Sequence, residues 1–308
     1  MPPKTSRCVA AVDCGTNSIR LLLADLDTER LSGTDIAREM RIVRLGEGVD
    51  RTGRLSDAAI ERTMTALREY ADLIRQHSPE AVRMVATSAS RDASNAGDFT
   101  RQVKEVLGVE PEVVSGDEEA RLSFTGATRE LAGADGGPFL VTDIGGGSTE
   151  FVIGDSHIST NIGCVRITER CLHSDPPAET EIAEATSVID AALDEAAAAV
   201  PATEARTLVG LAGSVTTIAG IALGLGGYDS ARIHHSRVSA SHVHAIARQL
   251  LTQTSAERAQ IPVMHSGRAD VIQAGALILD RIMTRFGFGE VLVSEHDILD
   301  GIAWSLAQ

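Results

Sequence analysis

The sequence predicts an α/β fold made of two similar domains, and two observations support this. Apolar runs of strand length alternate along the chain with longer segments in which apolar residues recur at helical spacing. In addition, one pattern of strand, glycine turn and strand occurs twice, first around Asp13 and again around Asp143. A chain of 308 residues with 43% hydrophobic residues has room for about two domains and their cores.

The two copies of this pattern match with a constant spacing along the sequence, equal to the number of positions from Asp13 to Asp143. Solenoid repeats are only about 20–50 residues long, so the offset indicates two domains that each present a glycine-containing hairpin to a shared cleft. The copies differ at one matched position, where Arg20 corresponds to Glu150. Chance similarity of two glycine turns is the alternative, and the shared register argues against it. The matching pairs are Asp13 with Asp143, Gly15 with Gly145, Ser18 with Ser148, and Asp25 with Asp155.

The other elements follow from apolar spacing and from cap residues. Ser56 is expected to cap the first long helix, because apolar residues recur after it at Ile60, Met64 and Leu67. Hairpins are predicted at 8–26 and 141–153, single strands at 38–48, 82–87, 112–114 and 291–294, and a strand, glycine turn and helix within 208–220. Other helices are predicted after 56, at 99–107, from 115, and at 177–200, 239–251, 271–286 and 298–306.

A third glycine, Gly213, follows an apolar strand, and the chain is expected to turn there and enter a helix. Backbone amides at the start of such a helix could hold an anion. A plain tight connection from strand to helix explains the same residues equally well.

The formal net charge of −15 disfavours nonspecific binding to nucleic acid or to a membrane, since both need a basic surface. The sequence contains no apolar run of the roughly 18 residues that a transmembrane helix needs. Its N-terminus lacks a signal-peptide pattern, so a cytoplasmic location is expected. No P-loop motif is present either. Any binding of phosphate must therefore use backbone amides, arginine or a metal ion.

Histidines occur close together at His234 and His235 and again at His242 and His244. A metal site would need a convergent third ligand. None is evident in the sequence, so these histidines are predicted to be surface residues. The cysteines show no CxxC spacing and are predicted to be reduced; they are Cys8, Cys14, Cys164 and Cys171.

The second hairpin has the residues expected of a phosphate site with a metal ion. The glycines at 145–147 remove every Cβ from the turn, so an anion can lie directly against backbone amides. Asp143 ends the first strand and Glu150 begins the second, which brings both carboxylates to the same end of the hairpin. Mg²⁺ bound to phosphate commonly takes one or two carboxylates. Alternatively, Asp143 caps the turn by hydrogen bonding.

Together these motifs resemble those of the actin-like ATPase superfamily. More narrowly, they resemble the exopolyphosphatase and guanosine pentaphosphate phosphohydrolase family in its short, two-domain form. The resemblance spans essentially the whole chain and is most specific at 115–121 and 143–150. It implies two actin-like (ribonuclease H-like) domains with a central cleft. Domain I would span 1–130, with a C-terminal helix at 297–308 packing back on it, and domain II would span 131–296. The other matching stretches are 13–18, 86–92, 211–217, 268–275 and 293–294.

The resemblance implies that water hydrolyses a terminal phosphoanhydride bond of inorganic polyphosphate and releases orthophosphate. It makes Glu119 the catalytic base, although from the residues alone Glu119 could equally be a solvated helix start. It makes Asp143 and Glu150, with Asp13 through water, ligands of Mg²⁺ or Mn²⁺, and it implies a homodimer. The residues implied to bind substrate are Asp13, Gly15, Thr16, Asn17, Ser18, Arg20, Arg91, Gly145, Gly146, Gly147, Ser148, Thr149, Gly213 and Ser214, and weaker candidates are Arg121, Arg166 and Arg268.

Three other functions stay open at this point. Within the family, the enzyme could convert guanosine pentaphosphate to the tetraphosphate. The chain could instead be an actin-like ATPase or sugar kinase with an adenosine site near Gly213, or a binding protein without catalysis. Longer family members carry an added C-terminal helical domain that this sequence lacks, which favours short polyphosphate chains as the expected substrate.

Overall fold

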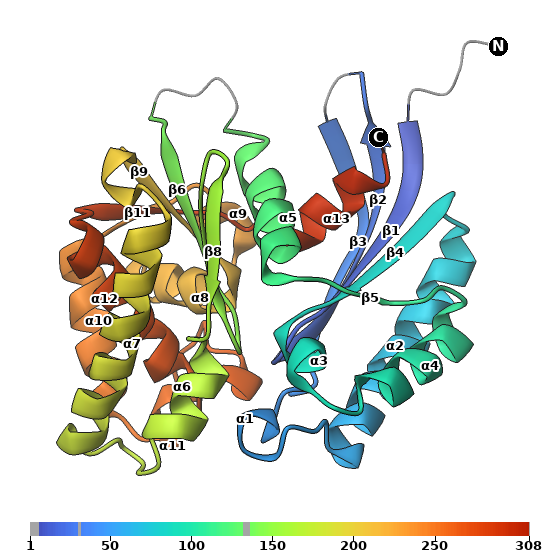
Figure 1. Ribbon diagram of the computed structural model, residues 1–308. Helices are drawn as coiled ribbons and strands as arrows, with labels where there is room; N and C mark the ends of the chain where they lie inside the picture. The colour runs from blue at the N-terminus through green and yellow to red at the C-terminus, as the bar shows by residue number, and fades with distance from the viewer. Residues whose placement is uncertain (1–5, 30–31, 132–135, 308) are drawn as a thin grey trace. The chain divides into compact units, whose positions relative to one another are not determined.

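The computed structural model describes residues 6–29, 32–131 and 136–307. The chain divides into two compact units. Unit 1 comprises residues 1–126 and 298–308, and unit 2 comprises residues 127–297. Each unit contains one mixed β-sheet with helices packed on it (Figure 1). The predicted α/β class is therefore confirmed.

The sheet of unit 1 has five strands in the order β3-β2-β1-β4-β5. The first three strands form an antiparallel meander, and β4 and β5 continue the sheet parallel to β1. The carboxyl ends of β1, β4 and β5 consequently lie next to one another at one edge of the sheet. The strands are β1 (Ser6–Cys14), β2 (Ser18–Asp27), β3 (Ser32–Ile42), β4 (Ala81–Ala86) and β5 (Glu112–Val113).

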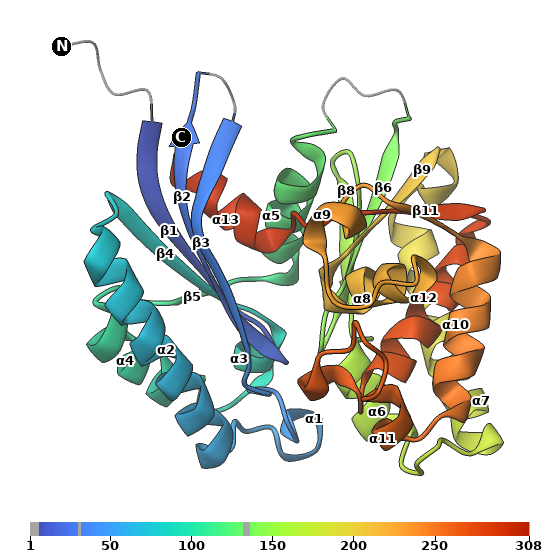
Figure 2. The ribbon, with the colours of Figure 1, turned by 180° about the vertical axis from the view of Figure 1, so that it is seen from behind.

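Helices pack on both faces of this sheet, and the side chains of β1 alternate between the two faces. Ala10 and Val12 pack against the long helices on one face. Val9 and Ala11 pack on the other face, together with Leu122 and the last helix of the chain. Figure 2 shows α2 and α4 on one side of the sheet and α13 on the other. The helices of unit 1 are α1 (Val49–Thr52), α2 (Asp57–His77), α3 (Ser88–Asp92), α4 (Ala96–Leu107), α5 (Gly116–Thr128), which runs on into unit 2, and α13 (Ile298–Ser305).

The predicted cap of the first long helix is confirmed. The hydroxyl of Ser56 accepts a hydrogen bond from the amide of Ala59 at 3.2 Å and satisfies one of the free donors of the first turn of α2. Further along α2, the buried hydroxyl of Tyr70 donates to the carbonyl of Ile19 at 3.0 Å, which ties the helix to β2.

The sheet of unit 2 has six strands in the order β10-β11-β9-β6-β7-β8. Strands β6, β7 and β8 form an antiparallel meander, β9 and β11 run parallel to β6, and β10 is antiparallel to β11. Several elements here were not predicted, among them β8 and α6 (Cys164–Cys171). The strands are β6 (Phe139–Ile144), β7 (Thr149–Ile153), β8 (Ser156–Thr160), β9 (Thr207–Leu211), β10 (Arg237–Ser239) and β11 (Glu290–Val293).

The core of unit 2 is formed by helices packed on this sheet. Phe151 of β7, for example, meets Phe286 edge to face at a ring-centroid distance of 6.0 Å. No helix among the described residues is long and apolar enough to cross a membrane. The other helices of unit 2 are α7 (Glu179–Ala199), α8 (Ala212–Ala222), α9 (Ser230–Ile233), α10 (Ala240–Thr252), α11 (Ser255–Arg258) and α12 (Ile272–Phe286).

The internal repeat is visible in both sheets. The order β3-β2-β1-β4-β5 in unit 1 corresponds to β8-β7-β6-β9-β11 in unit 2. The two glycine turns are closed by equivalent hydrogen bonds, from the amide of Gly15 to the carbonyl of Ser18 at 2.9 Å and from Gly145 to Ser148 at 3.0 Å. The prediction that the two hairpins are copies of one pattern is therefore confirmed.

The packing of α13 in unit 1 can be tested at Gly301. A Cβ added there would overlap the backbone oxygen of Leu122, and a backbone atom cannot move aside as a flexible side chain can. We expect Gly301→Ala to destabilise the protein by about 1–3 kcal/mol, even though alanine is the better helix former. The measurement is the midpoint of urea unfolding.

Gly97 is the matched control, because it also lies in a helix but has open space where its Cβ would stand. Gly97→Ala should keep or raise the unfolding midpoint. If the two variants unfold at the same midpoint, Gly301 is not held against Leu122.

Candidate active site

Asp13 lies at the end of β1 in a position fixed by Arg20. The hairpin register places the two residues opposite each other. Arg20 donates to the same carboxylate oxygen, Oδ2 of Asp13, from Nε at 3.0 Å and from Nη2 at 2.6 Å. Because Asp13 is only 4% exposed, this ion pair orients a nearly buried carboxylate.

The turn that follows Asp13 is supported from two directions. The hydroxyls of Thr16 and Ser88 share a hydrogen bond of 2.8 Å, and Ser88 begins α3 directly after β4. The amide of Gly46 donates to the carbonyl of Thr16 at 2.9 Å. In the described part of the chain, the buried hydroxyl of Ser90 has no hydrogen-bond partner. A buried hydroxyl of this kind could donate to a phosphate oxygen.

Glu119 is held by Arg91. Glu119 lies in the first turns of α5 and is 7% exposed. Arg91 Nη1 donates to Glu119 Oε2 at 3.1 Å and to the carbonyl of Val114 at 3.0 Å. The carboxylate therefore has a fixed orientation, as a group that must orient a water molecule requires.

In unit 2, the first residues of α6 hold the carbonyl groups of the glycine turn. The amide of Cys164 donates to Gly145, and the amides of Val165 and Arg166 donate to Gly146, at 2.9–3.1 Å. Arg166 Nε donates to the carbonyl of Gly147 at 2.7 Å.

These contacts fix the direction of the amides in the same turn. The C=O and N–H groups of a trans peptide point in opposite directions. Since the carbonyls at 145–147 face α6, the amides of Gly146, Gly147 and Ser148 face away from it. Three amides on one side of a turn without side chains form a concave anion site. Gly163 permits this packing, because a Cβ there would overlap the carbonyl of Gly146.

Asp143 and Glu150 lie side by side next to the turn of this hairpin. The strand register places them opposite each other, and they are 7% and 2% exposed. The hydroxyl of Ser159, opposite Glu150 on β8, donates to Glu150 Oε1 at 2.7 Å. The donor set fits a hard divalent cation such as Mg²⁺.

The prediction that the chain turns at Gly213 before entering the helix is wrong. Helix α8 begins at Ala212 immediately after β9, and the residue with a left-handed backbone is Ala212, with a φ of 66°. The strand therefore connects directly to the helix. The absence of a Cβ at Gly213 instead leaves room for the guanidinium group of Arg268, which lies where that Cβ would stand. The structure thus places Arg268 against the first turn of α8.

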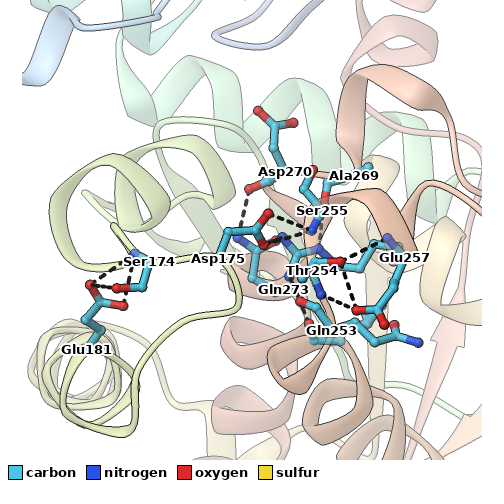
Figure 3. Close-up of polar contacts among 12 residues, drawn as sticks. Ser174, Asp175, Glu181, Gln253, Thr254, Ser255, Glu257, Ala269, Asp270 and Gln273 are labelled. Atoms are coloured by element: carbon cyan, nitrogen blue, oxygen red, sulfur yellow. Dashed lines mark hydrogen bonds and ion pairs between the residues drawn. The ribbon is translucent and has the colours of Figure 1, made fainter.

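The segment that carries Arg268 is anchored by a second arginine. Arg258, only 2% exposed, donates to the carbonyl of Ala269 at 2.6 Å and to that of Gln253 at 2.7 Å. Asp175 lies 3.5 Å from its guanidinium group and accepts a hydrogen bond from the amide of Ser255 at 2.8 Å. Figure 3 shows polar contacts in this region, among them that of Asp175 with Ser255.

Within each unit, the structure brings the predicted site residues together. In unit 1, Asp13, Arg20 and the turn at 15–18 lie at the sheet edge that also bears Arg91 and Glu119. In unit 2, Asp143, Glu150 and the turn at 145–149 lie beside the start of α8, which carries Gly213 and Ser214. That both groups border one cleft stays a prediction.

Three residues that support the site were not predicted: Ser88, Ser159 and Gly163. Recognition of β8 would have found Ser159, because its register with β7 follows from the short turn between these strands. Ser88 and Gly163 act through contacts that leave no local pattern.

His235 is exposed and His234 half-buried, as predicted for surface residues, but a carboxylate that the sequence did not reveal lies beside them. His234 Nε2 lies 3.0 Å from Glu130 Oε2, and atoms of Glu130, His234 and His235 that could bind a metal ion lie within 4.8 Å of one another. Glu130 is 104 residues away from His234 in the sequence, which is why no local pattern revealed it.

The chain is similar to known proteins over nearly its whole length. The chain is 50% identical to a protein named exopolyphosphatase 2 from Mycobacterium tuberculosis, over 97% of this chain and 98% of that protein. A crystal structure of an exopolyphosphatase-like protein is 41% identical, with a TM-score of 0.94 over 98% of each chain.

The Aquifex aeolicus PPX-GPPA enzyme is 32% identical and superposes with a TM-score of 0.81, over 97% of this chain and 99% of that chain. The expected fold of two actin-like domains is thereby confirmed. Residues 27–308 match the family described as Ppx/GppA phosphatase. With the glycine hairpins, the acidic pair and the helix bearing Glu119 in place, the chain belongs to the Ppx/GppA phosphatase family.

Proposed function

We propose that the protein is an exopolyphosphatase that releases terminal orthophosphate from inorganic polyphosphate. The observation that carries the proposal is the glycine turn, in which the amides of Gly146, Gly147 and Ser148 face away from α6, next to the buried pair Asp143 and Glu150. An anion site beside two carboxylates suits a phosphate that arrives with a divalent cation. The relative named exopolyphosphatase 2, similar over nearly its full length, supports the same activity.

Asp143 and Glu150 would hold Mg²⁺ or Mn²⁺, with Asp13 contributing through water. When bound, the cation would neutralise charge on the phosphoryl group and help to align it for attack. Ser159 would keep Glu150 in the orientation needed, since hydrogen bonds to a ligating carboxylate fix its position.

Glu119 would act as the general base. It would accept a proton from a water molecule whose oxygen forms a bond to the terminal phosphorus. The bond from that phosphorus to the bridging oxygen breaks, and its electron pair stays on the shortened chain. Orthophosphate is released. Arg91 would orient Glu119 and, with its remaining donors, bind phosphate oxygens.

The other substrate contacts would come from the two glycine turns and from the start of α8. Arg268 joins this set, because it lies against Gly213 at the start of α8. Arg166 donates to the Gly147 carbonyl, on the side of the turn opposite to the amides, and stays a weaker candidate. Short polyphosphate chains as preferred substrates, a homodimer and a cytoplasmic location stay predictions.

A substrate panel tests the proposal. The purified protein is assayed for phosphate release from short and long polyphosphate, guanosine pentaphosphate and ATP, each with Mg²⁺, with Mn²⁺ and with a chelator. We expect release from polyphosphate that the chelator abolishes. Turnover of ATP alone would make the protein an actin-like ATPase, and turnover of guanosine pentaphosphate alone would favour the alarmone phosphatase.

Substitution of the base should separate catalysis from binding. Glu119→Gln keeps the size of the side chain but removes its ability to accept a proton, so the rate of phosphate release should fall by about 10²–10⁴-fold. Binding of polyphosphate, measured by calorimetry, should change little.

Glu118→Gln is the control for this experiment. Its carboxylate is 40% exposed and lies 3.5 Å from Arg83, so the rate should stay near that of the wild type. Equal rates for Glu119→Gln and the wild type would remove Glu119 from the mechanism.

The hydrogen bond from Ser159 predicts a defect specific to the metal ion. Loss of a partner to a ligating carboxylate commonly weakens metal binding by about 10–100-fold. Ser159→Ala should therefore raise the Mg²⁺ concentration that gives half-maximal activity by that factor, and excess Mg²⁺ should restore the rate. Ser156→Ala on the same strand is the control. A lower maximal rate with an unchanged Mg²⁺ requirement would contradict the role of Ser159.

A further inference from the structure

Unit 2 contains a group of titratable side chains that the proposed reaction does not use. It consists of Glu130, His234, His235 and His296, which we call the histidine cluster. Glu130 Oε2 lies 3.0 Å from His234 Nε2 and 3.4 Å from His296 Nδ1. The rings of His234 and His235 stack at a centroid distance of 3.7 Å. Histidines and a carboxylate gathered in this way are the side chains that bind transition metals.

We propose that Glu130, His234 and His235 bind a Zn²⁺ ion. In a tetrahedral zinc site with bonds of about 2.0–2.1 Å, ligand atoms lie about 3.3 Å apart. The Glu130–His234 distance is close to that value, and the third ligand atom lies within 4.8 Å of both. Small movements of side chains would close the site, and water would take the fourth position. His296 would hydrogen bond to Glu130 and orient it.

The backbone at His235 supports this assignment. His235 has a φ of 60°, a left-handed conformation that is uncommon for residues other than glycine. Strain of this kind persists only where surrounding contacts enforce it. The strained residue directly follows His234, and the rings of His234 and His235 stack. The amide of His235 donates a hydrogen bond to the carbonyl of Val293 at 2.7 Å.

Zinc binding would change one hydrogen bond in a defined way. The amide of Glu295 donates to His234 Nδ1 at 3.1 Å, so neutral His234 carries its proton on Nε2 and donates it to Glu130. When Nε2 binds the metal, this proton must leave, and the neutral ring then carries a proton on Nδ1. Nδ1 can no longer accept from Glu295, and that hydrogen bond breaks.

The position of the cluster in the chain gives this change a structural consequence. Glu130 lies four residues after Gly126, where the chain leaves unit 1, and His296 lies two residues before Ile298, where it returns. Both segments that join the units therefore meet at this cluster within unit 2. A zinc ion there would bind one of them through Glu130 and alter the hydrogen bonding of the other at Glu295.

The test is calorimetric titration of the metal-free, full-length protein with Zn²⁺ in excess Mg²⁺. We expect one tight site per chain, and Co²⁺ in the same site should give visible absorption bands of a tetrahedral centre. His234→Asn and His235→Asn should each weaken zinc binding by at least about 100-fold. His242→Asn, an exposed histidine on α10, should bind like the wild type.

Two further measurements make the result specific. Hydrogen exchange of the Glu295 amide should become faster when zinc binds. Asp143→Asn alters the proposed catalytic metal site but should leave zinc binding at the histidine cluster unchanged. This variant therefore distinguishes the two metal sites. Absence of saturable zinc binding, or equal binding by the wild type, His234→Asn and His235→Asn, would overturn the proposal.

Discussion

Each unit is organised by one hydrogen bond, from the amide of a glycine to the carbonyl of a serine three residues later. This bond closes a tight hairpin and so fixes which residues of its two strands are paired. Asp13 faces Arg20 in unit 1, and Asp143 faces Glu150 in unit 2. A parallel neighbour, β4 or β9, then ends at the same edge of the sheet. The chemistry of each unit is collected at that edge because the hairpin fixes where its strands end.

One substitution between the copies separates their roles. In unit 1, Arg20 forms an ion pair with Asp13. In unit 2, Glu150 occupies the corresponding position and leaves two nearly buried carboxylates side by side, with a hydrogen bond from Ser159 to one of them. Adjacent carboxylates are oxygen ligands of the kind that Mg²⁺ takes. The same fold therefore produces one hairpin in which an arginine pairs with the aspartate and one that presents two carboxylates.

The sequence predicts those parts of the fold whose signals are local. The two hairpins, the cap at Ser56 and most helices follow from spacing within a few residues. Strand β8 carries no such signal, because Ser-His-Ile-Ser-Thr is mostly polar and becomes a strand by pairing with the buried strand β7. Helix α6 is short, and its first amides are satisfied by carbonyls of the glycine turn. Both elements depend on partners that propensity cannot reveal.

The supports of the site were harder to predict than its reactive groups, and the reason is physical. A reactive carboxylate or glycine turn is recognisable by residue type, whereas a support is defined only by what it contacts. Gly213 illustrates this, since it looks like a turn residue and instead makes room for Arg268, 55 positions later in the sequence. His234 meets Glu130 across 104 positions in the same way. Long-range packing turns ordinary residues into parts of a site, so its chemistry can be inferred before its geometry.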